Sequence, residues 1–148
     1  MTDFIETVRN TLNLPKIEKP ELLAPLDLAY IGDNVYELYN RLIALSEGSR
    51  QVEKLHRECS ERANAKTQAK MVLLLEPLFT EEEAEIYRRG RNAKVYTKAK
   101  NASITEYHEA TGLEAVVGYL FLREEYERLS GLLLEGFTKL GFVWKKKD

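Results

Sequence analysis

The fold is decided by a stretch of ten residues, Leu28-Ala-Tyr-Ile-Gly-Asp-Asn-Val-Tyr-Glu37. Its apolar side chains, and those that follow, recur every three or four positions, as on a helix face turned to a core: Leu28, Ile31, Val35, Leu38, Leu42 and Leu45. Asp33 lies on the opposite side, among small, aromatic and polar residues: Ala29, Tyr36, Glu37, Asn40 and Ala44. The pattern predicts a helix packed on both sides. Because an unpaired buried charge is costly, Asp33 needs a metal ion or a basic group beside it.

Length and composition indicate one globular domain. The chain has 148 residues, 44% of them apolar, which is enough for a single core. Its formal net charge of −2 gives no indication of a polyanionic partner. The single cysteine, Cys59, excludes an internal disulfide and a thiolate metal cluster. We see no export signal at the N-terminus, and no apolar run approaches the roughly 18 residues that span a bilayer. We therefore expect a cytoplasmic protein without a membrane span.

Helical patterns account for nearly the whole chain, and we see no strand pattern and no repeat. The predicted class is therefore all-α. We expect Asp27 to cap the first long helix, Thr80 and Glu83 to form a capping box, and Gly90 to end the helix that this box opens. The expected helices are 3–11, 27–45, 50–75, 80–89, 105–122 and 124–140. Residues 1–148 form one domain, in which 1–25 are an N-terminal helix and a proline-containing connector and 26–140 are the core.

A basic segment runs from Arg88 to Lys100 without an acidic residue. Neutral hydrogen-bonding side chains are interleaved with its charges. This mixture of point charges and neutral donors suits a phosphate backbone. A solvated basic loop is the alternative reading of the same residues.

A second acidic residue interrupts another apolar helix, Ala110-Thr-Gly-Leu-Glu-Ala-Val-Val-Gly-Tyr-Leu-Phe-Leu122. Glu114 lies in its first part, and Gly118 follows one turn later. A glycine in a helix interior costs about 1 kcal/mol relative to alanine, which indicates close approach of a neighbouring backbone or space kept beside the carboxylate. Glu114 alone reads as structural. Together, Asp33 and Glu114 could converge on a hard cation such as Mg²⁺, which prefers oxygen ligands.

These stretches resemble a known family. Leu28–Glu37 resembles the signature helix of ribonuclease III, and Ala110–Gly118 resembles the second acidic helix of that family. Further stretches are similar to the Mini-ribonuclease III branch, which lacks a double-stranded-RNA-binding domain: Arg88-Arg-Gly-Arg-Asn-Ala-Lys94, and Leu55-His56 followed by Asn64-Ala-Lys-Thr-Gln-Ala-Lys70. The resemblance covers about residues 26–140 and implies that these form a ribonuclease III-like catalytic core.

The resemblance implies that Asp33 and Glu114 are the catalytic, metal-binding acids. The chain departs from the larger ribonuclease III pattern at Ala29 and Thr111, where the family has further acids. A site of four carboxylates is therefore not available. Waters and substrate phosphate would complete the metal shell, or Glu37 would contribute through a water. Asn34 also stands where a small Ala or Ser is usual.

The implied activity is Mg²⁺-dependent hydrolysis of double-stranded RNA, with precursor 23S ribosomal RNA as the substrate. The resemblance also implies a homodimer, whose interface we expect on the signature helix at Leu28, Ile31, Val35, Tyr36 and Tyr39. Duplex RNA is recognised largely through its shape, phosphates and 2′-hydroxyl groups. The candidate RNA-binding residues are Arg89, Arg91, Asn92, Lys94, Thr97, Lys98 and Lys100, with Lys66 and Lys70 as weaker additions.

Two other functions fit parts of the sequence. All-α nucleotide pyrophosphohydrolases also use helical carboxylates and Mg²⁺, although they normally offer several acidic pairs, whereas here Asp33 and Glu37 form the only convincing one. A non-catalytic RNA- or ribosome-binding module on the same scaffold is the second alternative. The missing acids at Ala29 and Thr111 favour it.

Overall fold

The computed structural model describes residues 3–48, 51–93 and 103–143. These residues contain α-helices and two short 3-10 turns, Pro20–Leu22 and Glu76–Leu78, and no strand. The prediction of an all-α fold is therefore confirmed. None of the described helices is both long and apolar enough to cross a membrane. The helices are α1 (Phe4–Leu12), α2 (Pro25–Ser46), α3 (Val52–Ala63), α4 (Ala65–Leu75), α5 (Glu81–Asn92), α6 (Ile104–Leu122) and α7 (Tyr126–Lys139).

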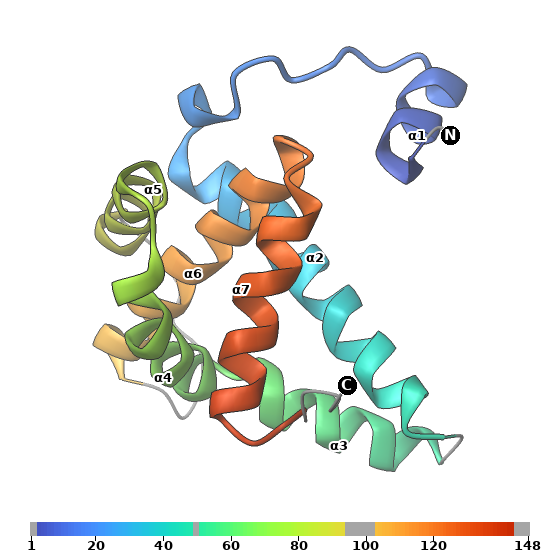
Figure 1. The fold of residues 1–148 in the computed structure, drawn as a ribbon, viewed down its shortest axis with the longest axis vertical. Helices are drawn as coiled ribbons and strands as arrows, with labels where there is room; N and C mark the ends of the chain where they lie inside the picture. Colours follow the sequence, from blue (N-terminus) through green and yellow to red (C-terminus); the bar gives the residue numbers. More distant parts are fainter. Residues whose placement is uncertain (1–2, 49–50, 94–102, 144–148) are drawn as a thin grey trace.

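Helix α6 is the centre of the fold. It packs against α2, α4, α5 and α7, and it is buried on all sides along most of its length (Figure 1). Helix α1 lies at the end of an extended connector and has no buried residue, and its Arg9 pairs with Glu124, between α6 and α7, at 3.6 Å. Because α6 is apolar all round, it must be enclosed by other helices. Its buried residues are Ala110, Thr111, Gly112, Leu113, Ala115, Val116, Val117, Gly118, Tyr119 and Leu120.

Helices α2 and α6 touch backbone to backbone at two glycines. A Cβ atom on Gly32 would lie 1.8 Å from the carbonyl oxygen of Glu114, and one on Gly118 would lie 2.0 Å from that of Leu28. Helix axes usually stay 8–10 Å apart because side chains separate them, so only glycine allows this contact. The sequence prediction that Gly118 marks a close backbone approach is confirmed. The contact places the residues that follow Gly32 directly against the first half of α6.

The helix predicted over residues 50–75 is two helices, so that prediction is wrong. Asn64 adopts an extended conformation between them, and its side-chain oxygen accepts a hydrogen bond of 2.8 Å from the backbone N–H of Thr67. The Thr67 hydroxyl in turn donates to the carbonyl of Glu61, at 2.7 Å. Asparagine is a favoured N-cap because its side chain satisfies a free backbone donor in the first turn. The break lets α4 start in a new direction, across α6.

Three other helix ends test the sequence analysis. Helix α2 begins at Pro25, and Asp27 lies in its first turn instead of capping it, because proline is well suited to the first helical position. Gly90 does not end α5 either. It is buried inside the helix, where a Cβ atom would lie 3.0 Å from the Cα atom of Gly112. The capping box of Thr80 and Glu83 is confirmed.

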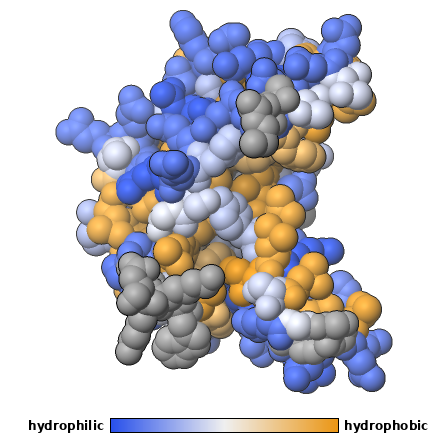
Figure 2. Space-filling model, turned by 45° about the vertical axis from the view of Figure 1, so that its right-hand side comes forward, coloured by the Kyte–Doolittle hydropathy of each residue, from blue (hydrophilic) through white to orange (hydrophobic). Residues whose placement is uncertain are grey.

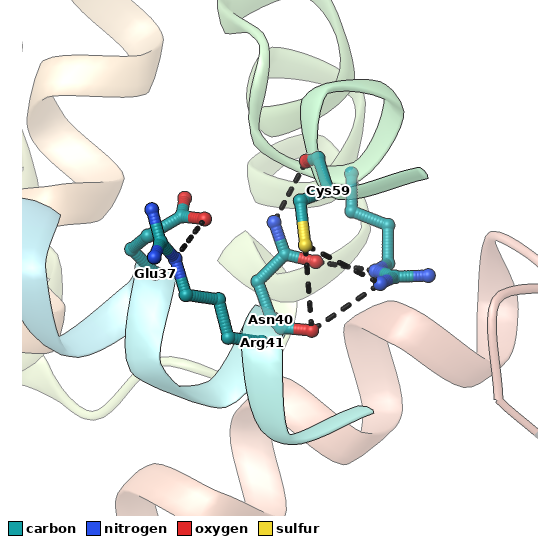
Figure 3. A network of polar contacts seen from close by, with 5 residues as sticks. Glu37, Asn40, Arg41 and Cys59 are labelled. Carbon is teal, nitrogen blue, oxygen red and sulfur yellow. Dashed lines mark hydrogen bonds and ion pairs between the residues drawn. The ribbon is translucent and has the colours of Figure 1, made fainter. Parts of the chain in front are cut away.

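A buried polar network holds α3 against α2 (Figure 3). The Asn40 amide donates to the carbonyl of Cys59 at 2.7 Å, and the Arg62 guanidinium donates to the Asn40 side-chain oxygen. The Tyr36 hydroxyl donates to the carbonyl of Arg62 at 2.6 Å. Buried polar groups must be hydrogen-bonded, so these partners fix the relative position of the two helices. The second face of α2 is thus packed, as the sequence predicts.

The apolar stripe of α2 is only partly in the core. Leu28 and Val35 are buried, but Leu38, Leu42 and Leu45 are 52%, 58% and 61% exposed. The expectation that the whole stripe faces the core is therefore wrong for its second half. The expected dimer interface is also wrong at Leu28, Val35 and Tyr36, because these three residues are buried within one subunit. Figure 2 shows apolar side chains gathered in a band across one face of the molecule.

Candidate active site

Asp33 from α2 and Glu114 from α6 meet in a pocket of about 430 Å³. The glycine contact brings them together, because Gly32 precedes Asp33 and packs on the backbone of Glu114. Asp33 is exposed, whereas Glu114 is half-buried in the middle of α6. The structure thus joins two acids that are 81 positions apart in the sequence. The pocket is lined by Leu26, Ala29, Tyr30, Asp33, Ala63, Ala65, Gln68, Tyr107, Ala110, Thr111 and Glu114.

The two carboxylates are electrostatically coupled. Burial, together with the neighbouring Asp33 carboxyl and its charge, raises the pKa of Glu114 to about 9, while the Gln68 side chain acts in the opposite direction. When two carboxylates share a site, one of them stays protonated up to a higher pH unless a positive partner compensates the charge. The pair therefore takes up either a proton or a cation, and the latter would hold both groups in their charged form.

The donor set suits a hard divalent cation. Mg²⁺ keeps several waters and is often bound by only one or two carboxylates plus substrate phosphate. In residues 3–48, 51–93 and 103–143, no group of three His, Cys, Asp or Glu side chains is placed to hold a metal ion. A closed zinc site, which needs four nitrogen or sulfur ligands, does not fit. An open site with two protein carboxylates does.

The positions that depart from the family pattern also line this pocket. Ala29 is buried beside Asp33, and Thr111 lies on α6 one turn before Glu114. The Thr111 hydroxyl donates to the carbonyl of Tyr107 in its own helix, at 2.9 Å. Glu37 does not line the pocket, and its carboxylate pairs with Arg41 at 3.3 Å (Figure 3).

The candidate RNA-binding residues lie in different settings. Lys66 and Lys70 are exposed on α4, one turn apart, and their charges act on Glu106 in the first turn of α6. The Arg89 guanidinium donates to the carbonyls of Glu21 and Leu23, at 3.0 and 3.3 Å, and so ties α5 to the connector. Arg91 stacks 5.4 Å above the ring of Tyr87, and Asn92 is exposed at the end of α5. Lys94, Thr97, Lys98 and Lys100 lie outside the described residues.

Sequence reasoning missed three polar or aromatic residues of the pocket. Gln68 is only 3% exposed and contacts Glu114, Tyr30 is 78% exposed at the edge, and Tyr107 completes the wall from α6. Neutral side chains carry no charge pattern. The one available signal for Gln68 was Asn64, because an N-cap there fixes which residues of α4 share a face.

Comparisons with known proteins show the family of the chain. Residues 26–125 match the family described as Ribonuclease III domain. Mini-ribonuclease 3 of Streptococcus pneumoniae is 44% identical over 76% of this chain and 89% of its own, and that of Staphylococcus aureus is 42% identical over 76% and 86%. A crystal structure of a Fusobacterium nucleatum protein has a TM-score of 0.71 and 29% identity, covering 75% of this chain and 90% of that one. The chain therefore belongs to the ribonuclease III family, in its Mini-ribonuclease 3 branch.

Proposed function

We propose that this chain uses Asp33 and Glu114 to hold Mg²⁺ and to hydrolyse phosphodiester bonds of double-stranded RNA. Its family makes the chain an endoribonuclease of the ribonuclease III class. The observation that carries the proposed site is the meeting of the two acids in one pocket, where burial and mutual repulsion favour a bound cation. Residues 26–140 would form the catalytic core, and the cytoplasm would be its compartment.

The protein's part in the reaction is to position charge. When bound, Mg²⁺ polarises the scissile phosphate and lowers the pKa of a coordinated water. Asp33 and Glu114 hold this ion, and the backbone contact at Gly32 keeps the two carboxylates close together. With Ala29 and Thr111 in place of further acids, the remaining coordination positions fall to waters and substrate phosphate. Glu37 would act only through a water.

The proposed substrate is an A-form duplex, and more narrowly the precursor of 23S ribosomal RNA. The deep, narrow major groove of A-form RNA cannot be read by side chains, so binding depends on phosphate and 2′-hydroxyl contacts. Lysines and arginines of α4, of α5 and of the stretch of sequence that follows α5 would supply the phosphate contacts. This group comprises Lys66, Lys70, Arg89, Arg91, Lys94, Lys98 and Lys100, with Asn92 and Thr97 as neutral partners.

The decisive experiment offers the purified protein three substrates: a long RNA duplex, one of its strands alone, and a nucleoside triphosphate, each with Mg²⁺ or EDTA. We expect cleavage of the duplex only, and only with Mg²⁺. Hydrolysis of the triphosphate would instead indicate a pyrophosphohydrolase. Duplex binding without cleavage at any Mg²⁺ concentration would indicate the non-catalytic module that the residues at positions 29 and 111 allow.

We also propose that the chain forms a homodimer through the exposed part of α2. Leu38, Leu42 and Leu45 follow one another on this helix, and Tyr30 is exposed near its start. Soluble monomers rarely expose contiguous apolar patches of large size, so such a surface indicates a partner. Two-fold association is the commonest arrangement of identical subunits.

Sedimentation equilibrium tests the dimer. We expect the wild-type chain to sediment as a dimer and Leu42→Glu, which places a charge in the middle of the surface, to weaken association at least tenfold. The exposed Leu73→Glu on α4 is the matched control, with an expected dimer affinity close to wild type. A monomeric wild-type protein at all concentrations would contradict the proposal.

Two lysines of α4 give a test of the RNA-binding surface. Replacing Lys66 and Lys70 by Ala should weaken duplex binding for all sequences and reduce the slope of log K against log salt by about one per lost phosphate contact. Binding is measured in EDTA so that cleavage does not interfere. The matched control replaces Lys54 and Arg57, exposed on α3 away from the pocket, and should leave the slope nearly unchanged. Equal slopes in both double variants would show that α4 does not face the RNA.

A further inference from the structure

Gln68 is a buried polar residue to which neither its helix nor the family resemblance assigns a role. It is 3% exposed, it lies one turn into α4, and it lines the same pocket as Asp33 and Glu114. A glutamine is rarely buried to this degree without a partner, because an unpaired amide in a protein interior destabilises the fold. Its polar neighbour in the pocket is the Glu114 carboxyl, and the interaction of the two side chains favours the charged form of Glu114.

The chemistry of the two groups decides which one donates. An ionised carboxylate has only acceptor atoms, so toward charged Glu114 the Gln68 amide N–H is the donor. The interaction therefore opposes both burial and Asp33, which favour the protonated acid. Among the described residues that line the pocket, Gln68 contributes the only side-chain amide.

The fold fixes where this amide points. Asn64 caps α4 through the Thr67 N–H and so sets the register of the helix at its first turn. Helix α4 packs on α6, and Met71, one turn after Gln68, is fully buried in the core. Residue 68 thus lies between a capped first turn and a turn that is buried in the core, and its own side chain is 3% exposed.

We propose that Gln68 is a positioning residue of the metal site, whose amide holds the Glu114 carboxylate in the orientation that binds the divalent cation. This inference rests on the proposed function, because it takes Asp33 and Glu114 as the metal ligands. Residues that hydrogen-bond to metal ligands orient them, and their loss typically costs 10–100-fold in metal affinity or activity. In a site with two protein carboxylates, the misorientation of one removes half of the protein's ligands.

The test is Gln68→Met, which keeps a similar length and volume but cannot donate a hydrogen bond. Binding of Mn²⁺, a hard cation that carboxylates also accept, is followed by electron paramagnetic resonance of the free ion in the absence of RNA. We expect the Mn²⁺ dissociation constant to rise 10–100-fold. Thermal unfolding in EDTA should stay close to wild type, and duplex binding in EDTA should not change. The matched control is Met71→Leu, on the same helix but outside the pocket, with expected wild-type affinity for Mn²⁺.

Two outcomes overturn the inference, and they are distinguishable. If Asp33→Asn loses Mn²⁺ while Gln68→Met binds it within twofold of wild type, Gln68 has no positioning role and the proposed site stands. If Asp33→Asn binds Mn²⁺ as tightly as wild type, the proposed site itself is wrong. Should Gln68→Met not fold, Gln68→Asn takes its place, because its amide is one methylene too short for the same contact. The same loss of affinity is then expected.

Discussion

Asp33→Asn and Glu114→Gln are each expected to reduce duplex cleavage by at least about a thousandfold. Each change removes one negative charge from the metal site at nearly constant shape. A bound metal ion contributes several kcal/mol of charge stabilisation to the transition state, and about 4 kcal/mol corresponds to a factor of a thousand in rate. Single-turnover cleavage of a labelled duplex, with enzyme in excess over RNA, measures the chemical step directly.

Two controls separate the loss of metal from a loss of fold or of binding. Asp27→Asn changes an exposed acid in the first turn of α2, and Glu109→Gln changes an acid of α6 that does not line the pocket; both should cleave at nearly the wild-type rate. Duplex affinity of the two site variants, measured in EDTA, should stay within a few-fold of wild type. Cleavage by both site variants at near wild-type rates would show that the acids have been wrongly assigned.

Gly32→Ala is expected to be the most disruptive single-methyl change in the protein. The added Cβ atom would lie 1.8 Å from the carbonyl oxygen of Glu114, which is a backbone atom and cannot rotate away. Overpacking of a well-packed core usually lowers the free energy of unfolding by about 1–3 kcal/mol. For Gly32→Ala we expect a loss of about 3 kcal/mol or more, because α2 and α6 must move apart as whole helices. Urea unfolding followed by circular dichroism gives the change in the free energy of unfolding.

Gly131→Ala is the matched control for this prediction. Gly131 is exposed in the middle of α7, and a Cβ atom there would meet no atom within 4 Å. The same substitution should therefore stabilise the protein by up to about 1 kcal/mol, the gain in helix propensity from glycine to alanine. Equal effects at positions 32 and 131 would mean that α2 and α6 are not in backbone contact.

The sequence predicts the helices well where local chemistry decides them and poorly where it does not. The capping box at Thr80 is correct because both of its partners lie within one turn. The break at Asn64 was missed because the apolar spacing of Val52, Leu55 and Cys59 carries on smoothly into Ala63. At Gly90 the rule that glycine ends helices gives the wrong result. The glycine lies inside α5 because only a residue without a side chain can pack this closely on Gly112.

The residues of the candidate site also fall into those that the sequence predicts and those that it does not. Asp33 and Glu114 could be predicted because each is a charged residue within an otherwise apolar helical pattern. Gln68 was missed because a neutral amide in a helix produces no such intrusion, and its role depends on which residue lies across from it. The apolar stripe of α2 could be predicted only in part. Its periodicity correctly predicts an apolar helix face, but the spacing is the same whether that face packs in the core of the chain or against another subunit.

The glycine contact between α2 and α6 also sets a requirement for anyone who wishes to transplant this pair of acids into a designed helical bundle. Copying the two carboxylates alone would place them on helices whose axes stand 8–10 Å apart. At that spacing a layer of side chains would separate the two acids. Gly32 and Gly118 must therefore be copied together with Asp33 and Glu114, although neither glycine would touch the metal.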